Sequence, residues 1–294
     1  MDVIAVAPAG RAADYVTLAK PRLNFLVVAS TMLGYAMAGG RFSDVSLAAL
    51  TFIGTALVAG GGSAFNQVFE RTADAQMRRT QARPMADGRL NPFEGLMFAS
   101  VTSTAGLLTL ATGVNVLSAC IAAATLVLYV AVYTPLKPRT SFATVIGAIP
   151  GALPPVIGWA AGQDALAPGA WILFGIVFLW QLPHFLSIAW MCREDYARAG
   201  YQMLPVIEPD GRSTARQAVL YAAALVPMSL TPTLAGLATT TYFVGALILT
   251  LLFLALAVKF AMTRSDGDAR RLFFGSITYL PLLWILMIAS RATQ

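Results

Sequence analysis

Charged residues are scarce in this sequence of 294 residues, in which Asp, Glu, Lys and Arg together make up 12%. Soluble domains carry about 25% charged residues, whereas 57% of this chain is hydrophobic. So small a polar share cannot cover the surface of a water-soluble fold. The composition therefore excludes a soluble globular protein and favours one that lies in a membrane.

Cysteine and histidine are almost absent, since the chain has two Cys and one His. Cys120 and Cys192 fall in different apolar segments, which argues against a disulfide and against a cysteine-ligated metal cluster. The first 20 residues do not read as a signal peptide, because Asp2 opens them and their apolar run is short. They are expected to form a cytoplasmic tail.

Long uncharged segments occupy most of the chain. They cover residues 25–40, 45–69, 95–136, 141–163, 165–192, 217–258 and 272–290. Two of them are of double length and contain turn-rich breaks at residues 112–115 and 236–241. At about 20 residues for each membrane crossing, the sequence predicts an all-α integral membrane protein. We expect about nine transmembrane helices in one domain, residues 21–294.

The basic residues indicate how this domain is oriented. With nine spans, the N-terminal tail and every second loop lie on one side, and they carry 18 of the 20 Lys and Arg residues. Only Arg41 and Arg291 lie on the other side. The positive-inside rule then places the tail and these loops in the cytoplasm, and the C-terminus outside the cytoplasmic (inner) membrane. The net charge of +6 thus reflects topology, and no nucleic-acid partner is expected.

A first group of polar residues stands at the end of the second apolar segment. Asn66, Glu70 and Asp74 recur every four residues, so they share one stripe of a helix. Two carboxylates and an amide oxygen suit Mg²⁺, which is commonly held by one or two carboxylates together with substrate phosphates. An ordinary solvated helix end is the alternative reading, but polar groups at membrane depth tend to be functional.

Basic residues follow this group directly. Arg78 and Arg83 are expected to bind the phosphates that the metal holds, because guanidinium groups bind phosphate oxygens in pairs. Lys137 and Arg139, in the loop after the fourth span, are expected to join them. Arg79 and Arg89 are interpreted as topology signals only.

A second acidic group follows the sixth span. Asp195 precedes Pro205 by ten residues, the same spacing that separates Asp74 from Pro84. The match indicates two weakly repeated halves around a central cavity, with motif loops at residues 66–90 and 192–216. Glu70, Asp74 and Asp195 are therefore predicted as metal ligands. The carboxylates of Asp74 and Asp195 are expected to face each other across about 10 Å, the scale of a diphosphate with two Mg²⁺ ions.

The single histidine, His184, lies within the sixth apolar segment. A lone His in an apolar helix is commonly a hydrogen-bonded core residue. On a continuous helix it would lie about 16 Å deeper in the membrane than Asp195, at 1.5 Å per residue. That depth suits a second substrate better than a diphosphate.

These motifs resemble the UbiA-type intramembrane prenyltransferases and, within them, the branch that acts on haem. The likeness extends over residues 20–287. The first motif is carried by Asn66, Glu70, Asp74, Met77, Arg79, Thr80, Arg83 and Pro84. The later ones are Tyr133-Thr134, Leu136-Lys137, Pro154-Pro155, Ile157-Gly158-Trp159, Pro183-His184-Phe185, Asp195-Tyr196, Ala199-Gly200 and Met203-Leu204-Pro205.

The resemblance implies a reaction. The farnesyl group of farnesyl diphosphate would be joined to a vinyl group of haem B, giving haem O and diphosphate with Mg²⁺ as cofactor. Asn66, Glu70, Asp74 and Asp195 would be catalytic, and His184, Tyr133 and Tyr196 would contact the haem. Haem A synthase or terminal oxidase assembly would supply partners.

Two positions depart from the family pattern, and two rival functions stay open. Ala143 stands where many members have Asn, and Ala199 where many have a second Asp. A prenyltransferase acting on an aromatic or quinone precursor is the nearest rival. A transporter or lipid-binding membrane protein is the other, although a transporter would place its ionisable residues near the bilayer midplane.

Overall fold

A computed structural model describes residues 10–40 and 44–292 of the chain. Arg41 and Gln294, which the predicted orientation puts outside the membrane, and the first nine residues of the predicted tail lie outside the described ranges. The chain begins with a short helix α1 (Arg11–Ala19). The long helices are α2 (Pro21–Met37), α3 (Val45–Gln76), α4 (Pro92–Gly113), α9 (Pro168–Met191), α12 (Arg212–Leu234), α13 (Thr240–Thr263) and α14 (Asp266–Ala289).

Two membrane crossings are built from shorter pieces. The fourth consists of α5 (Val116–Val127), a π-helical turn η1 (Leu128–Tyr133) and α6 (Thr134–Leu136). The fifth consists of α7 (Ala143–Ala152) and α8 (Pro154–Gln163), which are separated at Leu153 in a Gly- and Pro-rich segment. Two small helices, α10 (Arg193–Arg198) and α11 (Leu204–Ile207), follow α9.

The prediction of an all-α membrane protein is confirmed. Within the described ranges, eight helical segments are long and apolar enough to cross a membrane. Helix α2 has 17 residues, which is the lower limit for a crossing. With α2 the described chain has the expected nine spans.

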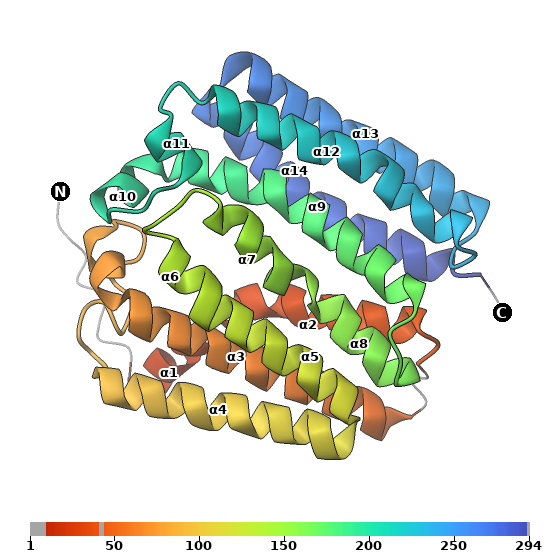
Figure 1. Ribbon diagram of the computed structural model, residues 1–294, viewed down its shortest axis with the longest axis horizontal. Helices are drawn as coiled ribbons and strands as arrows, with labels where there is room; N and C mark the ends of the chain where they lie inside the picture. The colour runs from red at the N-terminus through yellow and green to blue at the C-terminus, as the bar shows by residue number, and fades with distance from the viewer. Residues whose placement is uncertain (1–9, 41–43, 293–294) are drawn as a thin grey trace.

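The long helices lie roughly side by side, and the loops gather at the two ends of the bundle (Figure 1). Helix α3 packs between α2 and α4, α9 packs against α7, α12 and α14, and α2 packs against α8. The loops that follow α3 and α6 and the segment of α10 and α11 lie at the left end of the view. These are three of the loops that the basic residues predicted to share one side.

Glycine allows the closest contact in the bundle, between α2 and α8. A Cβ atom added at Gly34 would lie 1.9 Å from the carbonyl oxygen of Pro155, and one added at Gly158 would lie 1.7 Å from that of Thr31. No side chain fits at either distance. In a bilayer, where helices gain little from apolar burial against each other, such backbone contact is a main source of stability.

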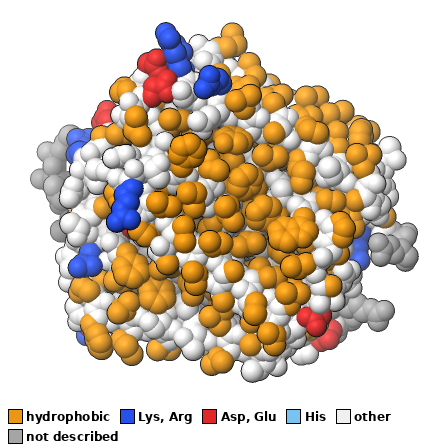
Figure 2. Space-filling view, in the orientation of Figure 1, with side chains coloured by type: hydrophobic (Ala, Val, Ile, Leu, Met, Phe, Trp, Pro, Cys, Tyr) orange, Lys and Arg blue, Asp and Glu red, His pale blue; other side chains and the backbone are white. Residues whose placement is uncertain are grey.

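The surface matches a lipid environment. Figure 2 shows a broad face covered by hydrophobic side chains, with the charged side chains near its margins. Large apolar residues such as Leu251, Leu252 and Ile285 are 47%, 60% and 64% exposed. An exposed apolar surface of this extent marks contact with a membrane.

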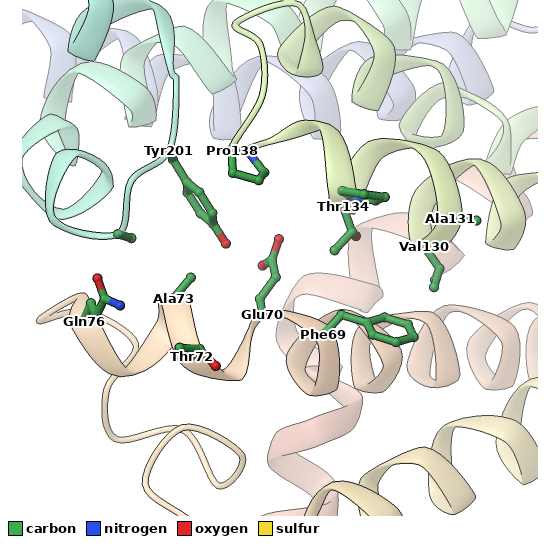
Figure 3. Close-up of a pocket in the computed structure, with 12 residues that line it drawn as sticks. Phe69, Glu70, Thr72, Ala73, Gln76, Val130, Ala131, Thr134, Pro138 and Tyr201 are labelled. Atoms are coloured by element: carbon green, nitrogen blue, oxygen red, sulfur yellow. The ribbon is translucent and has the colours of Figure 1, made fainter.

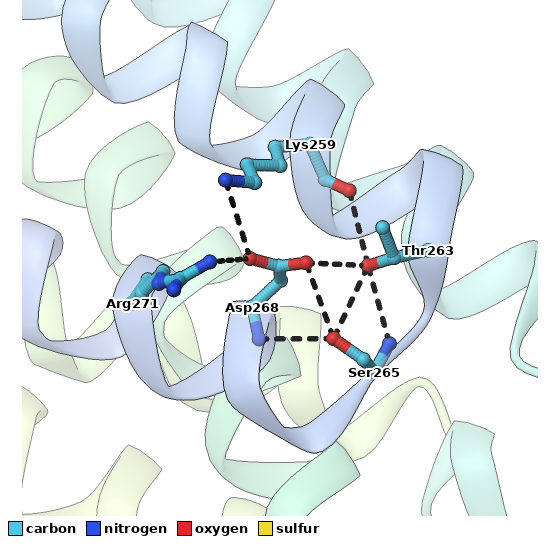
Figure 4. Close-up of polar contacts among 5 residues, drawn as sticks. All are labelled: Lys259, Thr263, Ser265, Asp268 and Arg271. Atoms are coloured by element: carbon cyan, nitrogen blue, oxygen red, sulfur yellow. Dashed lines mark hydrogen bonds and ion pairs between the residues drawn. The ribbon is translucent and has the colours of Figure 1, made fainter.

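Charged and polar residues at the facing ends of α13 and α14 hold this helical hairpin together (Figure 4). Ser265 caps α14 by accepting a hydrogen bond from the backbone N–H of Asp268, 3.1 Å away. The Asp268 carboxylate accepts a hydrogen bond of 2.7 Å from Thr263 and pairs with Arg271 at 2.7 Å. Lys259 Nζ lies 3.9 Å from the same carboxylate. Asp268 thus has enough partners within the hairpin to account for its burial.

Candidate active site

A cavity of about 460 Å³ lies between the helices and opens toward the loop end of the bundle. Its walls come from α2, α3, α5, η1, α7, α8 and α9, together with residues of the loops that follow α3, α6 and α10. The ionisable residues on its wall apart from His184 and the tyrosines come from the junction of α1 and α2, from α3 and from the loops that follow α3 and α6. They are Lys20, Glu70, Asp74, Arg79, Arg83 and Lys137.

Two ion pairs dominate the charged end of the cavity. Lys137 Nζ lies 2.6 Å from Glu70 Oε1, and Arg83 Nη1 lies 2.7 Å from Asp74 Oδ2. Burial lowers the pKa of Lys137, but the Glu70 carboxylate outweighs it and the net shift is upward. Lys137 therefore stays charged. The structure thus brings Glu70, Asp74, Arg83 and Lys137 together in one cavity.

One carboxylate oxygen of Asp74 has no partner among the described residues. The Asp74 side chain is 1% exposed, and the oxygen in question is Oδ1. A buried carboxylate oxygen without a partner is costly. A cation bound beside Glu70 and Asp74 would remove that cost, and carboxylate oxygens are the ligands that Mg²⁺ prefers. The residues present therefore fit a magnesium ion.

Asn66 is hydrogen-bonded to Lys20, a cavity residue that the sequence motifs do not include. The Lys20 ammonium donates a hydrogen bond of 3.2 Å to Asn66 Oδ1, and Asn66 Nδ2 donates one of 3.3 Å to Thr134. Burial, together with the nearby Arg83 and Lys137, lowers the pKa of Lys20 to about 7. Four basic side chains thus crowd around two carboxylates, an arrangement that fits a ligand of high negative charge.

The backbone holds Lys20 in this place. Its φ of +46° lies in the left-handed region, which is uncommon for a residue other than Gly and tends to occur at functional sites. The Gln67 amide fixes the preceding helix by donating bonds of 3.1 Å to the carbonyls of Thr17 and Leu18. The Lys20-Pro21 step, where one helix stops and the next begins, was the signal available in the sequence.

The π-helical turn η1 lies on the wall beside Glu70. Tyr129 and Tyr133 both line the cavity, their rings are stacked at 5.8 Å, and Lys137 Nζ lies 4.6 Å from the centre of the Tyr133 ring. π-Helical turns are rare and frequent at functional sites. Tyr133, predicted to contact the acceptor, thus stands at the charged end of the cavity.

Asp195 does not line the cavity. Its two carboxylate oxygens accept hydrogen bonds of 3.3 Å from the backbone N–H groups of Arg78 and Arg79, and Arg198 also pairs with it. Among the described residues, Glu70, Asp74 and Asp195 do not form a metal-binding cluster. The expected convergence of three carboxylates is therefore absent from this arrangement, because Asp195 is bound to the loop that follows α3.

Apolar contacts and one backbone bond join the same loops. Met77, Tyr201 and Met203 form a small buried cluster that also includes Tyr196. The N–H of Gln202 donates a hydrogen bond of 3.2 Å to the carbonyl of Lys137. The loops after α3, α6 and α10 therefore meet over the mouth of the cavity, and Tyr196, a predicted acceptor contact, lines it.

The predicted phosphate-binding arginines need correction. Arg78, Arg79 and Arg139 are all exposed, but of the three only Arg79, which was read as a topology signal, lines the cavity. The turn at Met77 ends α3 with an extended backbone, so the helix stripe no longer gives the directions of the arginines that follow it. Arg89 does not line the cavity, and it pairs with Asp14 and Asp87 at 2.7 Å.

A second, apolar groove borders the cavity on the outer side of Glu70. It has a volume of about 600 Å³ and is lined by residues of α3, η1 and α6 and by Tyr201. Figure 3 shows the Tyr201 hydroxyl pointing toward the Glu70 carboxylate. Burial and the charges of Glu70 and Asp74 raise the pKa of Tyr201. Glu70 and a protonated Tyr201 thus separate the groove from the cavity.

His184 lines the same cavity on another wall, α9, together with Phe185 and Ile188. Its Nδ1 lies 2.7 Å from Ser276 Oγ on α14. The helix stops at Met191, so the assumption of one continuous helix from His184 to Asp195 was wrong. The ring is both hydrogen-bonded to a neighbouring helix and accessible to a ligand of the cavity.

Apolar residues line the space between the charged end and the interior of the bundle. Val58, Leu126 and Ile157 are among them. Val58 precedes Glu70 by 12 residues on α3, which corresponds to about 18 Å at 1.5 Å per residue. The cavity therefore offers a charged end that suits an anionic head group and an apolar arm that suits a long hydrocarbon chain.

Comparison with known families and proteins identifies relatives of this chain. The sequence pattern of the UbiA prenyltransferase family matches residues 27–284. Protoheme IX farnesyltransferase of Solibacter usitatus is 49% identical over 95% of this chain and 98% of its own length. The mitochondrial protoheme IX farnesyltransferase of Arabidopsis thaliana is 35% identical over 95% of this chain and 65% of its own length.

Solved structures show the same fold at low sequence identity. The chain is similar to a structure described as digeranylgeranylglyceryl phosphate synthase, with a TM-score of 0.80, 16% identity and coverage of 96% and 99% of the two chains. A UbiA homolog from Archaeoglobus fulgidus bound to GPP and Mg²⁺ has a TM-score of 0.61 and 18% identity, and 93% and 99% of the two chains are covered.

Proposed function

Because the chain belongs to the UbiA prenyltransferase family, we propose that it transfers the farnesyl group of farnesyl diphosphate to a vinyl group of haem B, giving haem O and diphosphate. The enzyme class follows from the family, and the substrates follow from relatives that share up to 49% of their sequence over nearly the whole chain. The observation that supports this assignment best is the cavity, which joins a cationic end, an apolar arm and one histidine.

The reaction needs an anion to leave and a carbocation to be shielded. The C1–O bond of farnesyl diphosphate breaks with both electrons going to diphosphate, and the vinyl π electrons attack C1. Water then adds to the resulting cation beside the porphyrin ring and loses a proton. The overall change consumes haem B, farnesyl diphosphate and water, and it yields haem O, diphosphate and a proton.

The charged end of the cavity serves the leaving group. Lys20, Arg79, Arg83 and Lys137 would donate charged hydrogen bonds to the diphosphate oxygens and stabilise the negative charge that develops as the bond breaks. Asn66 holds Lys20 in place and would orient a ligand water. The apolar wall around Val58, Leu126 and Ile157 would exclude water from the prenyl cation until the new bond forms.

Glu70 and Asp74 would hold the Mg²⁺ ion, for which the orphaned Asp74 Oδ1 is the main support. When bound, the ion supplies positive charge that helps diphosphate to leave. Without it, the two carboxylates would repel an anionic substrate. Asp195, predicted as a third ligand, would in the present arrangement hold Arg79 at the mouth of the cavity.

His184 would bind the acceptor. Imidazole is a common axial ligand of haem iron, and the flat rings of Trp180 and Phe273 both stack on that of His184. The aromatic or quinone precursors used by other members of the superfamily contain no metal to which this nitrogen could bind. His184 thus distinguishes the proposed function from its nearest rival.

The proposed setting is the bacterial inner membrane, with the motif loops in the cytoplasm and the C-terminus outside. The support is the distribution of Lys and Arg, 18 of 20 on one side. Haem A synthase or a terminal oxidase would use the product. Single cysteines placed at residues 83 and 164 test the orientation, because an impermeant reagent added outside intact cells should label position 164 and leave position 83 unlabelled.

Purified protein in lipid nanodiscs provides the direct test of function. Incubation with farnesyl diphosphate, haem B and Mg²⁺ should give haem O, identified by mass, and one diphosphate for each haem O formed. A parallel reaction with an aromatic prenyl acceptor is expected to give no product. Product from the aromatic acceptor alone would contradict the proposed acceptor.

A further inference from the structure

One face of α14 holds the ring of His184. Ser276 Oγ lies 2.7 Å from Nδ1, and the Phe273 ring, one turn earlier on α14, stacks on the imidazole at 5.1 Å with an interplanar angle of 21°. Trp180 stacks on the imidazole as well, at 5.3 Å and 17°. The indole N–H of Trp180 donates a bond of 2.8 Å to the carbonyl of Ser276. Ser276 therefore fixes both the histidine and one of its stacking partners.

The hydrogen bonds also determine which nitrogen of His184 carries the proton. The Ser276 hydroxyl donates its only proton to the carbonyl oxygen of Phe273, 2.5 Å away. With its proton on that carbonyl, the Ser276 oxygen accepts from His184, and this assignment places the ring proton on Nδ1. In a neutral imidazole the other nitrogen, Nε2, is left with a lone pair.

Nε2 is the remaining site of interaction on the ring. No described residue bonds it, and His184 lines the cavity. No acidic side chain among the described residues pairs with the ring, and an imidazolium charge without such a partner is costly in apolar surroundings. An unprotonated nitrogen held in a fixed orientation is what a metal ligand requires, and histidine ligands almost always donate their other N–H to a neighbouring group.

We propose that Ser276 is a positioning residue that holds His184 as the Nδ1–H tautomer, so that Nε2 can bind the iron of haem B. The inference rests on the proposed function, since it supplies a device for recognising an acceptor that contains a metal. It also adds a residue that the sequence motifs do not include. Acceptor choice would then depend on a serine of α14 as well as on the motif of α9.

Spectroscopic titration with haem B tests this role. Ser276→Val and Ser276→Thr are nearly isosteric, so they place similar volume against α9 and differ in the hydroxyl. We expect Ser276→Val to weaken haem B binding about tenfold, the lower end of the loss seen when a partner of a metal ligand is removed. It should also shift the absorption spectrum of the bound haem. Ser276→Thr should bind as wild type does.

The chain offers a matched control. Ser187 is as buried as Ser276, and its hydroxyl donates 2.7 Å to the backbone carbonyl of His184 rather than to the ring. Ser187→Ala should leave haem B binding and its spectrum unchanged. Metal-free protoporphyrin IX should bind equally to wild type and to Ser276→Val, because it contains no iron for Nε2.

These experiments distinguish a wrong role for Ser276 from a wrong role for His184. If His184→Ala leaves haem B affinity and spectrum unchanged, the acceptor role of His184 is wrong and the role of Ser276 is wrong with it. If His184→Ala weakens binding and Ser276→Val matches Ser276→Thr, only the positioning role is overturned. Equal weakening of protoporphyrin IX binding by Ser276→Val would show a packing effect and would also overturn it. Formation of haem O in the nanodisc assay tests the function independently of all three.

Discussion

Asp74 and Asp195 each precede a proline by ten residues, yet they meet different surroundings in the fold. Asp74 lies on the last turns of α3, lines the cavity, and pairs one oxygen with Arg83 while the other has no described partner. Asp195 lies on α10, away from the cavity wall, with both oxygens bound to backbone N–H groups of the loop after α3.

Helix continuity explains the difference. Helix α3 runs for 32 residues and carries Asn66, Glu70 and Asp74 along one stripe into the cavity. Helix α9 stops at Met191, and Cys192, with φ −104° and ψ 15°, separates it from α10. The first carboxylate group is therefore available to a ligand, whereas the second is engaged by the protein itself. Similar spacing thus produces a carboxylate that faces the cavity in one half and, in the other half, a carboxylate that holds the loop after α3 by hydrogen bonds.

Asp74→Asn should have the largest effect. The substitution keeps the shape of a side chain that is 1% exposed, and it removes the charge that pairs with Arg83 and the oxygen proposed to hold Mg²⁺. We expect turnover to fall on the order of 10³-fold, the upper range for losing one electrostatic contact to a reacting group. Single-turnover formation of haem O at several Mg²⁺ concentrations measures it.

Asp87→Asn is the control for that change, because Asp87 is an exposed acid of the same loop that pairs with Arg89. It should keep full activity. The melting temperature of both variants checks that the fold persists. Activity of Asp74→Asn within a few-fold of wild type would remove Asp74 from the metal site and with it the contrast between the two motifs.

Lys20→Met should have the next largest effect. The change removes an ammonium that donates to Asn66 and stands among Arg83 and Lys137, while the backbone conformation suits Met as well as Lys. We expect the affinity for farnesyl diphosphate to fall about 10²-fold, since charged donors in water-poor sites bind phosphate strongly. Isothermal titration with a non-hydrolysable farnesyl analogue measures it.

Arg22→Met is the matched control, because Arg22 is exposed and lies two residues along the chain. Its affinity should equal that of wild type. Equal losses in the two variants would mean that Lys20 acts through general surface charge, and the cationic end of the cavity would then be smaller than proposed.

The sequence predicts most of the fold and the first motif because both depend on local pattern. Uncharged segments define the spans, and the four-residue period of Asn66, Glu70 and Asp74 holds on any straight helix. Lys20 could not be found this way, since its place depends on a left-handed turn between two helices. Ser276 belongs to the last helix, and only the packing of α14 against α9 brings it to His184.

The roles of the arginines and of Asp195 could not be predicted from local sequence pattern either, but the physical reason is different. Arg78 and Arg79 are neighbours in an irregular loop, and the pattern of charges is identical for either one pointing inward. The spacing of Asp195 from Pro205 was read as a repeat of the first motif, but it gives no information on where α9 ends. Loop direction depends on tertiary contacts that local sequence does not encode.

Arg79→Ala tests whether the loop after α3 contributes a phosphate contact. Arg79 lines the cavity and Arg78 does not, although both donate their backbone N–H to Asp195. We expect Arg79→Ala to raise the KM for farnesyl diphosphate about tenfold, as for the loss of one charged hydrogen bond. Arg78→Ala keeps the same backbone bonds and should remain within twofold, as expected of a surface residue. The reverse order would restore Arg78 as the phosphate-binding residue.

Asp195→Asn should have the smallest effect on turnover, and it is the direct test of the contrast between Asp74 and Asp195. An asparagine keeps one carbonyl oxygen to accept from the N–H groups of Arg78 and Arg79 but loses the charge that pairs with Arg198. Hydrogen bonds of this kind contribute about 1 kcal/mol to the stability of the folded loop. Turnover should therefore fall only about threefold to fivefold, with the Mg²⁺ requirement unchanged and the loop at residues 77–90 cleaved faster by protease.

The adjacent Glu194 provides the control, because it is exposed and Glu194→Gln removes the same charge without touching the loop. That variant should match wild type in turnover and in protease resistance. A loss in Asp195→Asn as large as that in Asp74→Asn, relieved by higher Mg²⁺, would identify Asp195 as a metal ligand. It would mean that α10 reorients when substrate binds, since both oxygens now face the loop, and the two acidic motifs would then be equivalent in function despite their different environments here.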